Sequence, residues 1–262
     1  MMIEGPAGTG KTFLYNLLAT YLRTEGKYYI NLSGTGIASS LLYQGQTCHS
    51  LFEIPLSIND PGYDVKMEKV RRLPDTERMR IKNAEVCFID EVSMLSAKQL
   101  DYIDKVLRLH GGRHKPFGGK FIVMGRDFRQ CLPIIKDATT AQLEASTILK
   151  TKIFTHGNQV KRQYLTDNMR AGENEIDFAR FLLQIGNGQK INETESFSLD
   201  GRMNSNRLVT IPNEMIFEGD LEGFIVEIFG LTKEDISNYF NRAILAPTNS
   251  SVMDINILVL QK

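Results

Sequence analysis

The sequence has few of the features of a secreted or membrane protein. Its 262 residues contain three cysteines, Cys48, Cys87 and Cys131, and none of them has the C-x-x-C spacing of a zinc or redox site. No stretch resembles a secretory leader, and no apolar run approaches the roughly eighteen residues that a membrane span requires. We therefore expect a soluble intracellular protein whose thiols are reduced and packed.

The sequence also lacks an excess of charge of either sign. Its 31 basic residues balance 31 acidic ones, so no global field draws the protein to nucleic acid or to an anionic membrane. Local basic runs at 66–82 and 105–120 leave room for a basic groove, although solvated helix faces explain such runs equally well. At this length we expect a globular protein of one or two domains that buries about three quarters of its unfolded surface.

A glycine-rich loop lies close to the start of the sequence. Residues 5–12 read GPAGTGKT and match the phosphate-binding pattern G-x-x-x-x-G-K-[ST], between residues 1–4, which can form only the tail of a strand, and a helical run at 13–22. Glycines let backbone N–H groups approach phosphate oxygens at the positive end of a helix. We predict that a nucleoside triphosphate binds Gly5, Pro6, Ala7, Gly8, Thr9, Gly10, Lys11 and Thr12; a glycine-rich turn without nucleotide is the alternative.

Short β-leaning runs at 28–32, 86–89 and 120–124 alternate with helical patterns. This alternation predicts an α/β fold with a parallel sheet flanked by helices, whose ligands bind beyond the carboxyl ends of the strands. Further along, residues 191–206 are polar and linker-like, residues 243–246 read as a strand, and residues 252–260 read as a helix. We interpret this later part as a second α/β unit that is begun but not finished.

Polar residues follow two of the predicted strands. Asp90 and Glu91 directly follow the apolar run 86–89. An ATPase needs one carboxylate there for Mg²⁺ and a second to polarise the attacking water; an acidic helix cap is the alternative. Gln130 follows the run 120–124 and can bond both the γ-phosphate and the water; a turn capped by Asp127 is the alternative. With Lys11 on the outer phosphates and Thr12 on the metal ion, these residues predict a Mg²⁺-ATP site.

Together these segments resemble the PIF-type (petite integration frequency) family of superfamily 1B DNA helicases, which includes the helicase regions of Helitron-type transposons. The resemblance rests on GPAGTGKTFLY, SGTGIASSLL (33–42), QTCHSLFEIP (46–55), FIDEVSML, GRDFRQCLPI, LTDNMR (165–170), FARFLLQIGNG (178–188) and ILAPTN (244–249). It implies a RecA-like P-loop NTPase fold, with a first ATPase lobe at 1–152, and an incomplete second RecA-like lobe at 153–262.

The resemblance also implies contacts with DNA. Thr35, Gly36, Thr47 and His49 fall in segments that touch the DNA backbone, and Asn249 falls in a similar segment of the second lobe. Hydroxyl, amide and imidazole donors suit phosphate contacts that do not read sequence. For Thr47 and His49 the alternative is a turn whose polar groups are satisfied locally.

Arg170, in LTDNMR, resembles the arginine finger that the second lobe points at the γ-phosphate, a group worth about 10³ to 10⁵ in rate. A surface salt bridge is the alternative. Two features depart from the family pattern. Arg126 replaces the glycine that usually precedes Asp127, and the sequence has neither the upstream adenine-recognition segment nor the later part of the second lobe. We therefore expect a fragment or a truncated, transposon-derived product.

The resulting hypothesis is an ATP-dependent DNA helicase. The resemblance implies that binding of ATP with Mg²⁺ draws the two lobes together and that hydrolysis releases them. The enzyme would then step 5′ to 3′ along single-stranded DNA and unwind duplex DNA in repair, recombination or transposition. The nucleus is the expected compartment and the mitochondrion the alternative; no membrane partner is expected. Two other functions stay open: a different P-loop ATPase, and a non-catalytic remnant that binds nucleotide and DNA.

Overall fold

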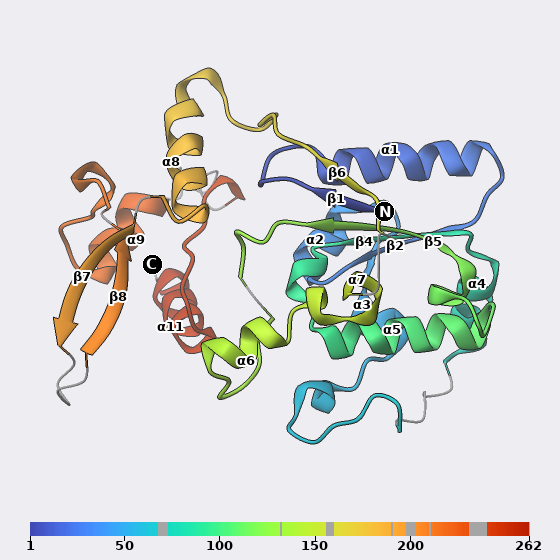
Figure 1. Cartoon of the computed structure of the whole chain (residues 1–262). Helices are drawn as coiled ribbons and strands as arrows, with labels where there is room; N and C mark the ends of the chain where they lie inside the picture. Colours follow the sequence, from blue (N-terminus) through green and yellow to red (C-terminus); the bar gives the residue numbers. More distant parts are fainter. Residues whose placement is uncertain are drawn as a thin grey trace. The chain divides into compact units, whose positions relative to one another are not determined.

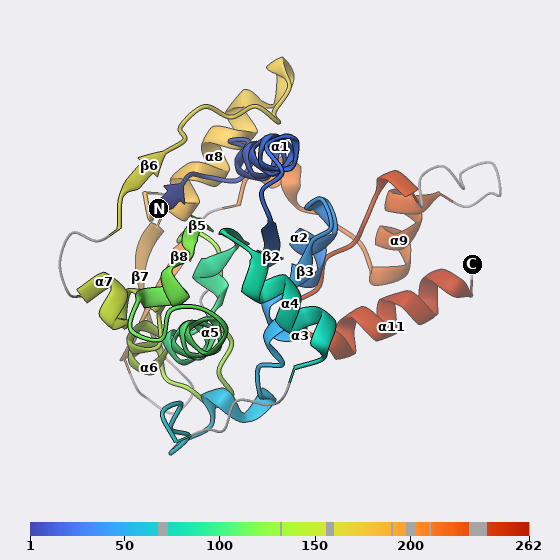
Figure 2. The same ribbon diagram turned by 90° about the vertical axis from the view of Figure 1, so that its right-hand side faces the viewer.

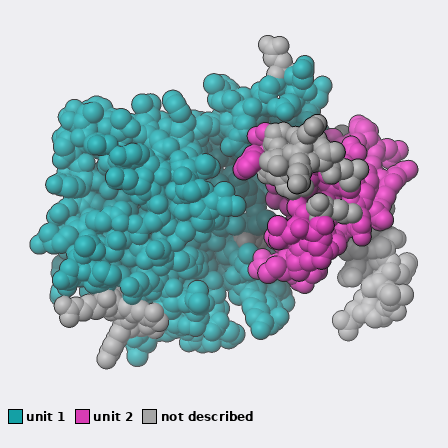
Figure 3. Space-filling view, turned by 180° about the vertical axis from the view of Figure 1, so that it is seen from behind, with its two compact units in different colours: residues 1–189 teal, residues 190–262 magenta. Residues whose placement is uncertain are grey.

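The computed structural model describes residues 1–67, 73–131, 133–155, 160–189, 191–197, 203–209, 211–230 and 240–261. The chain divides into two compact units, Met1–Gln189 and Lys190–Lys262, which Figure 3 shows in different colours. The first unit extends past residue 152, where the sequence places the end of the first lobe. The assignment of two RecA-like lobes with that boundary stays a prediction.

The first unit is built on a six-stranded sheet whose strands pair in parallel. The parallel pairing is what the sequence predicts, although it does not give the number of strands. The strand order is β3-β2-β4-β5-β1-β6 (Figure 1). The predicted strands at 28–32, 86–89 and 120–124 are confirmed as β2, β4 and β5, and the short β1 precedes the glycine-rich loop. The bounds are β1 (Met2–Glu4), β2 (Tyr29–Ser33), β3 (Gln46–Thr47), β4 (Val86–Asp90), β5 (Phe121–Arg126) and β6 (Arg162–Tyr164).

Helices cover both faces of this sheet. In Figures 1 and 2, α1 (Lys11–Thr24) lies on one face and α5 (Ala97–His110) on the other. The remaining helices of this unit are short: α2 (Gly36–Leu41), α3 (Cys48–Phe52), α4 (Asp75–Asn83), α6 (Thr140–Ala145), α7 (Lys152–Thr155) and α8 (Ile176–Gly186). Single 3-10 turns lie at Leu56–Asn59, Val92–Met94, Pro116–Gly119, Ile148–Lys150 and Glu173–Glu175.

The hydrophobic core consists of two clusters, one on each face of the sheet. On one face Ile3, Phe88 and Val123 pack against the buried side of α1, and on the other Met2 and Ile89 pack in a larger cluster with α5. Successive side chains of a strand point to opposite faces, so each central strand contributes to both clusters. Because both faces of the sheet are packed, the strands are held in place. The ends of these strands carry the candidate site.

The buried helix α5 begins where the sequence provides a complete cap. Ser96 accepts a hydrogen bond from the backbone N–H of Gln99, while the Gln99 side chain accepts one from the backbone N–H of Ser96. From there Leu100, Ile103 and Leu107 recur at helical spacing, and each is fully buried. The cap and the apolar stripe together fix both the start of α5 and the face it turns to the sheet.

Two of the three cysteines are buried free thiols, as expected: burial raises the pKa of Cys48 and of Cys87 to about 12. The expectation is wrong for Cys131, which is exposed. It lies in the loop that follows β5, directly after Gln130, where the chain has left the core. Among the described residues, no helix is long and apolar enough to cross a bilayer.

The second unit contains a β-hairpin and helices. Strand β7 (Ile191–Phe197) pairs antiparallel with β8 (Met203–Val209), and α9 (Leu221–Phe229) and α11 (Asn249–Leu260) follow, with a 3-10 turn at Asn213–Met215. The described part of the stretch 191–206 is therefore a pair of strands and not a linker, because the two segments satisfy each other's backbone groups despite their polar composition.

The expectation of a strand at 243–246 is also wrong. These residues lie outside helices and strands, since no described strand lies beside them to supply a ladder of hydrogen bonds. The helix expected at 252–260 is present and begins earlier, at Asn249. The hydroxyl of Thr248 caps it by accepting from the backbone N–H of Ser251.

Candidate nucleotide site

The glycine-rich loop connects β1 to α1 at the carboxyl edge of the sheet. Gly8 and Gly10 have φ values of 83° and 82°, a conformation that glycine adopts without strain and that turns the loop into the first residue of α1. Lys11 is buried, and its Nζ donates to the carbonyl oxygens of Gly5 at 2.7 Å and Pro6 at 3.0 Å. The lysine is thus held across the loop, with its ammonium group inside the turn.

Thr12 and Asp90 meet at the first turn of α1. The hydroxyl of Thr12 donates to Oδ2 of Asp90 over 3.2 Å, and Oδ1 of Asp90 accepts from the backbone N–H of Glu91. Burial raises the pKa of Asp90, while the Glu91 N–H, the Lys11 charge and the Thr12 hydroxyl oppose that rise. The carboxylate of Asp90 therefore faces the loop on the α1 side of the sheet.

Glu91 adopts a left-handed backbone conformation, with a φ of 50°, at the point where β4 ends. Its Oε1 accepts from Nε2 of Gln130 over 3.4 Å, and its Oε2 is buried without a hydrogen-bond partner among the described residues. Burial raises the pKa of Glu91, and the neighbouring charge of Asp90 raises it further. An unpartnered buried carboxylate oxygen is costly and marks a site where a ligand or water is accommodated.

Gln130 lies in a turn four residues beyond the end of β5. Oδ1 of Asp127 accepts from the backbone N–H of Arg129, and the Asp127 carbonyl accepts from the backbone N–H of Gln130. The turn capped by Asp127, which the sequence analysis kept as an alternative, is therefore present. The same turn holds the Gln130 amide against Glu91, so the cap and the site contact coexist.

Arg170 reaches the same place from the segment after β6. The backbone of that segment is tied to the loop: Leu165 N–H donates to the Glu4 carbonyl and Met169 N–H to the Gly8 carbonyl, each over 2.8 Å. Oδ1 of Asn168 accepts from the N–H groups of Arg170 and Ala171, which shapes the turn that carries the arginine. In this structure the arginine belongs to the first compact unit, and the residue before it, Met169, joins its segment to the phosphate loop by a backbone hydrogen bond.

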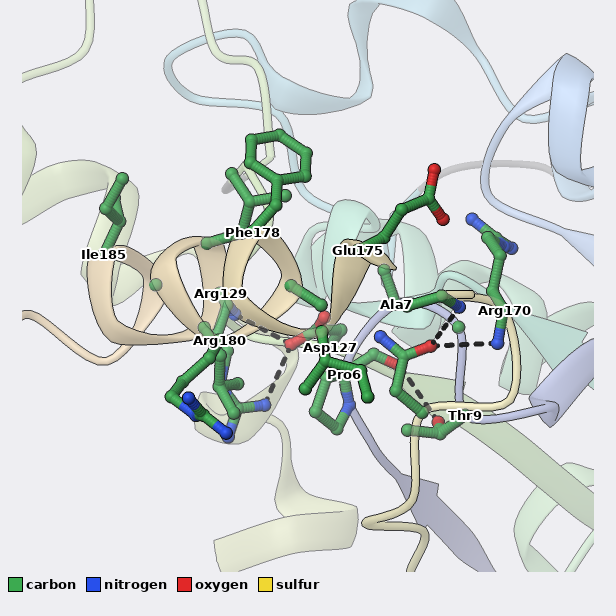
Figure 4. Close-up of a pocket in the computed structure, with 18 of the residues that line it drawn as sticks. Pro6, Ala7, Thr9, Asp127, Arg129, Arg170, Glu175, Phe178, Arg180 and Ile185 are labelled. Carbon is green, nitrogen blue, oxygen red and sulfur yellow. Dashed lines mark hydrogen bonds and ion pairs between the residues drawn. The ribbon is translucent and has the colours of Figure 1, made fainter. Parts of the chain in front are cut away.

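These residues line a cavity of about 610 Å³. Its lining comes from the loop, the acidic pair and the two later segments: residues 7–13 with Asp90, Glu91, Gln130, Met169 and Arg170. A neighbouring cavity of about 800 Å³ continues past Pro6 and Ala7 along α8. In Figure 4, Arg170 and Thr9 lie at one end of this second cavity and Arg129 and Ile185 toward the other.

The predicted DNA-contacting residues of the first unit lie at the ends of β2 and β3. Thr35 and Thr47 each accept a hydrogen bond at a helix start, from the N–H of Ala38 at 3.3 Å and of Ser50 at 3.1 Å, and Gly36 is the first residue of α2. These hydroxyls are satisfied in turns, as the alternative interpretation of Thr47 requires. None of the three is among the residues that line the two cavities.

His49 contacts a different element. The Gln99 side-chain oxygen accepts from Ser96 N–H, so its Nε2 is the donor toward His49 Nε2, 3.0 Å away, and the remaining imidazole proton is on Nδ1. Burial lowers the pKa of His49 and favours this neutral form. Asn249 opens α11 in the second unit.

Sequence reasoning missed two residues that shape the site. Gly125 faces α1, where a Cβ would lie 2.0 Å from the Tyr15 hydroxyl and 2.6 Å from Asp90 Oδ1. Burial raises the pKa of Tyr15 well above its ordinary range, with the charges of Asp90 and Glu91 as further causes. A glycine inside an apolar strand is the signal that could have revealed this close approach.

The fold and this geometry define the class. A parallel sheet that presents a glycine-rich loop, its lysine and an acidic pair at the carboxyl ends of the strands is a P-loop NTPase fold. The comparisons with known proteins then give the family: a family model described as PIF1-like helicase matches residues 1–196. The chain belongs to the PIF1-like helicase family.

Individual relatives agree with the family model. The chain is 29% identical over 254 residues to the ATP-dependent DNA helicase PIF1 of Saccharomyces cerevisiae, covering 90% of this chain and 29% of that protein. It is 35% identical over 135 residues to the ATP-dependent DNA helicase Pif1 of a Psychrobacter species, covering 51% of this chain and 20% of that protein. The chain thus spans less than a third of either relative.

A solved structure supports the fold. The crystal structure of Bacteroides Pif1 helicase in complex with ADP-AlF3 and single-stranded DNA matches with a TM-score of 0.60 and 29% identity. The match covers 72% of this chain and 42% of that one. The predicted RecA-like P-loop NTPase fold is confirmed.

Proposed function

We propose that this chain is the ATP-hydrolysing part of an ATP-dependent DNA helicase, which couples hydrolysis to 5′ to 3′ movement on single-stranded DNA and to duplex unwinding in repair, recombination or transposition. The observation that carries the proposal is the meeting of Thr12, Asp90, Glu91 and Gln130 around one cavity at the mouth of the phosphate loop. Family membership supports it, since the relatives named above are ATP-dependent DNA helicases. An intracellular location, in the nucleus or the mitochondrion, stays a prediction.

The side chains at the start of α1 fit a magnesium ion. Mg²⁺ takes oxygen ligands, and the Thr12 hydroxyl and Asp90 carboxylate already converge beside the unpartnered Glu91 Oε2. Bound with ATP, the ion would neutralise charge on the outer phosphates. Thr12 and Asp90 would hold it; burial raises the pKa of Asp90, and the Glu91 N–H, the Lys11 charge and the Thr12 hydroxyl oppose that rise, which favours the ionised form that a cation requires.

The remaining residues have distinct roles in the proposed reaction. Lys11 would exchange its two carbonyl partners for phosphate oxygens, and the N–H groups of the loop would bind the phosphate chain. Glu91 would accept a hydrogen bond from the attacking water, which Gln130 orients while it is bonded to the same carboxylate. Arg170, which also lines the cavity, would stabilise charge on the transferred phosphoryl group.

The DNA contacts are proposed for the adjoining part of the sheet edge. A threonine hydroxyl that accepts a backbone hydrogen bond still has a proton to donate, so the capping roles of Thr35 and Thr47 are compatible with phosphate contacts. Gly36 would offer a backbone N–H, and His49 its Nδ1 proton. Asn249 would add a contact from the second unit. Such contacts bind DNA without reading its sequence.

The proposal is tested by ATP turnover in the presence and absence of single-stranded DNA. We expect Lys11→Ala to abolish DNA-stimulated hydrolysis, because the ammonium group is the main positive charge inside the loop. Lys27→Ala, which removes an exposed lysine after α1, is the matched control and should leave turnover unchanged. Equal turnover by wild type and Lys11→Ala would show that hydrolysis occurs elsewhere.

A further inference from the structure

One partly buried carboxylate lies on the face of the sheet opposite Asp90. Glu4 is the last residue of β1, and strand register places it directly beside Arg126 of β5 and Tyr164 of β6. Its side chain points to the same face as that of Met2, which packs in the α5 cluster, whereas Asp90 and Gly125 face α1. The Glu4 side chain therefore lies on the other face of the sheet from Asp90.

Two arginines from different strands meet at one oxygen of this carboxylate. Nη2 of Arg126 lies 2.5 Å from Oε1 of Glu4, and Nε of Arg162 lies 3.7 Å from the same atom. The side chains of Arg126 and Glu4 are only 6% and 18% exposed, so the pair is screened little by solvent. Arg162 is half exposed and completes the cluster from β6.

Arg126 depends on Glu4 for its charge partner. Its guanidinium carbon lies 4.1 Å from the ring centroid of Phe128, which holds the plane of the group. Its Nε and Nη1 are buried without a hydrogen-bond partner among the described residues. A buried guanidinium is costly without an anion, and Glu4 is the anion that the described structure provides.

Each of the three residues is joined to a different segment of the candidate site. Glu4 directly precedes the phosphate loop, Arg126 directly precedes the turn that carries Gln130, and Arg162 begins the strand that leads to Arg170. We propose that Glu4 is a positioning residue: by binding Arg126 and Arg162 through one oxygen, it sets the phosphate loop, the Gln130 turn and the Arg170 segment in register for the transition state. This inference rests on the proposed ATP site.

We therefore expect loss of the Glu4 cluster to weaken binding of a transition-state analogue much more than binding of Mg²⁺-ADP. Losing the cluster should leave the loop able to bind Mg²⁺-ADP, since the N–H groups of the loop and Lys11 are untouched. It should displace Gln130 and Arg170, which act on the transferred phosphoryl group. A displacement of a catalytic group by about 1 Å can lower the reaction rate by about a hundredfold.

The experiment measures binding of Mg²⁺-ADP with and without aluminium fluoride to the full chain by titration calorimetry. Wild type should bind the fluoride complex at least about a hundredfold more tightly than Mg²⁺-ADP alone. Glu4→Gln should reduce this ratio by about tenfold or more, with the affinity for Mg²⁺-ADP held within about threefold. Glu77→Gln removes the same charge from the ion pair with Arg80 on α4 and should preserve the ratio.

A second variant separates positioning from folding. Glu4→Gln leaves Arg126 buried and unpaired, whereas Glu4→Gln/Arg126→Met removes both buried charges at similar volume, an exchange that proteins tolerate. We expect the double variant to recover the thermal midpoint of wild type and still lack its preference for the fluoride complex. A double variant, or a folded Glu4→Gln, with the wild-type ratio would overturn the inference alone. Absence of any preference in wild type would overturn the proposed ATP site and this inference with it.

Discussion

At the ends of β1, β4 and β5, polar side chains from separate elements contact one another, whereas at the ends of β2 and β3 the two threonines bond to their own turns. Thr12 reaches Asp90 and Gln130 reaches Glu91 across the sheet edge, but Thr35 and Thr47 cap the helices that follow them. The contacts of the first group join separate elements around one cavity and do not stabilise an individual helix or turn. The second builds local structure and leaves a donor free for a ligand.

This difference has a practical consequence for mutagenesis. We call the ends of β1, β4 and β5 the nucleotide half of the sheet edge, and the ends of β2 and β3 the proposed DNA half. In the nucleotide half, charged side chains are buried against one another, so a substitution can remove a function and leave the fold intact or even more stable. In the proposed DNA half, a substitution that removes a phosphate contact also removes a helix cap. Replacing one of these charged groups is therefore expected to weaken binding without lowering stability, whereas replacing Thr35 or Thr47 is expected to lower both.

The largest expected effect comes from filling the space behind the acidic pair. Gly125→Ala would put a methyl group 2.0 Å from the Tyr15 hydroxyl and 2.6 Å from Asp90 Oδ1, so one of them must move. Overpacking of this kind costs about 1–3 kcal/mol. We expect that loss in the free energy of urea unfolding, together with weaker Mg²⁺-nucleotide binding.

Gly36→Ala provides the matched control at the other half of the edge. No atom lies within 4 Å of the Cβ that it would add, and Gly36 is the first residue of α2. Its unfolding free energy should stay the same or rise by about 0.4–1 kcal/mol. Equal losses for both variants would remove the contrast between the two halves.

An intermediate effect is expected for Thr47→Ala. Loss of the cap on α3 should lower the unfolding free energy by about 1 kcal/mol. If Thr47 also donates to a phosphate, the affinity for single-stranded DNA should fall at every salt concentration. The log-log slope of that affinity against salt should stay nearly unchanged, because a neutral hydroxyl releases no counterion. Thr47→Ser keeps the hydroxyl and should keep both properties; a loss of stability without any loss of DNA affinity would assign Thr47 to structure alone.

The smallest effect concerns pH. Burial and Asp90 raise the pKa of Glu91 above its ordinary 4.5, so between 4.5 and the raised value the folded state binds more protons than the unfolded state. Unfolding free energy from this group therefore falls as pH rises through that window. Glu91→Gln should be more stable than wild type at neutral pH, and the difference should vanish as pH falls below 4.5, as measured by urea unfolding.

The nucleotide half could be predicted from sequence because each of its parts has a local pattern. The loop follows from glycine and lysine spacing, and the acidic pair follows from its place at the end of an apolar strand. Parallel topology then brings these strand ends to one edge. Contacts such as Glu4 with Arg126 could not be predicted, because they depend on the register of strands far apart in the sequence.

The later part of the chain shows where local patterns fail. Residues 243–246 have the composition of a strand, but strand formation depends on a neighbour that composition does not reveal. The polar segment at 191–197 forms a strand because 203–209 pairs with it. Cys131 was expected to be packed because the spacing of the cysteines suggests neither a metal site nor a redox pair, yet it lies in an exposed loop after the Asp127 turn.

The central claim is that a magnesium-bound triphosphate occupies the cavity where Lys11, Thr12, Asp90 and Glu91 meet. The most direct measurement is the affinity of the chain for a non-hydrolysable ATP analogue with Mg²⁺ and with EDTA, in wild type and in Asp90→Asn. Removal of the ion should weaken binding by wild type at least about tenfold, since Asp90 would hold the ion that neutralises phosphate charge, and should change binding by Asp90→Asn much less. An identical response to EDTA in the two proteins would contradict the account.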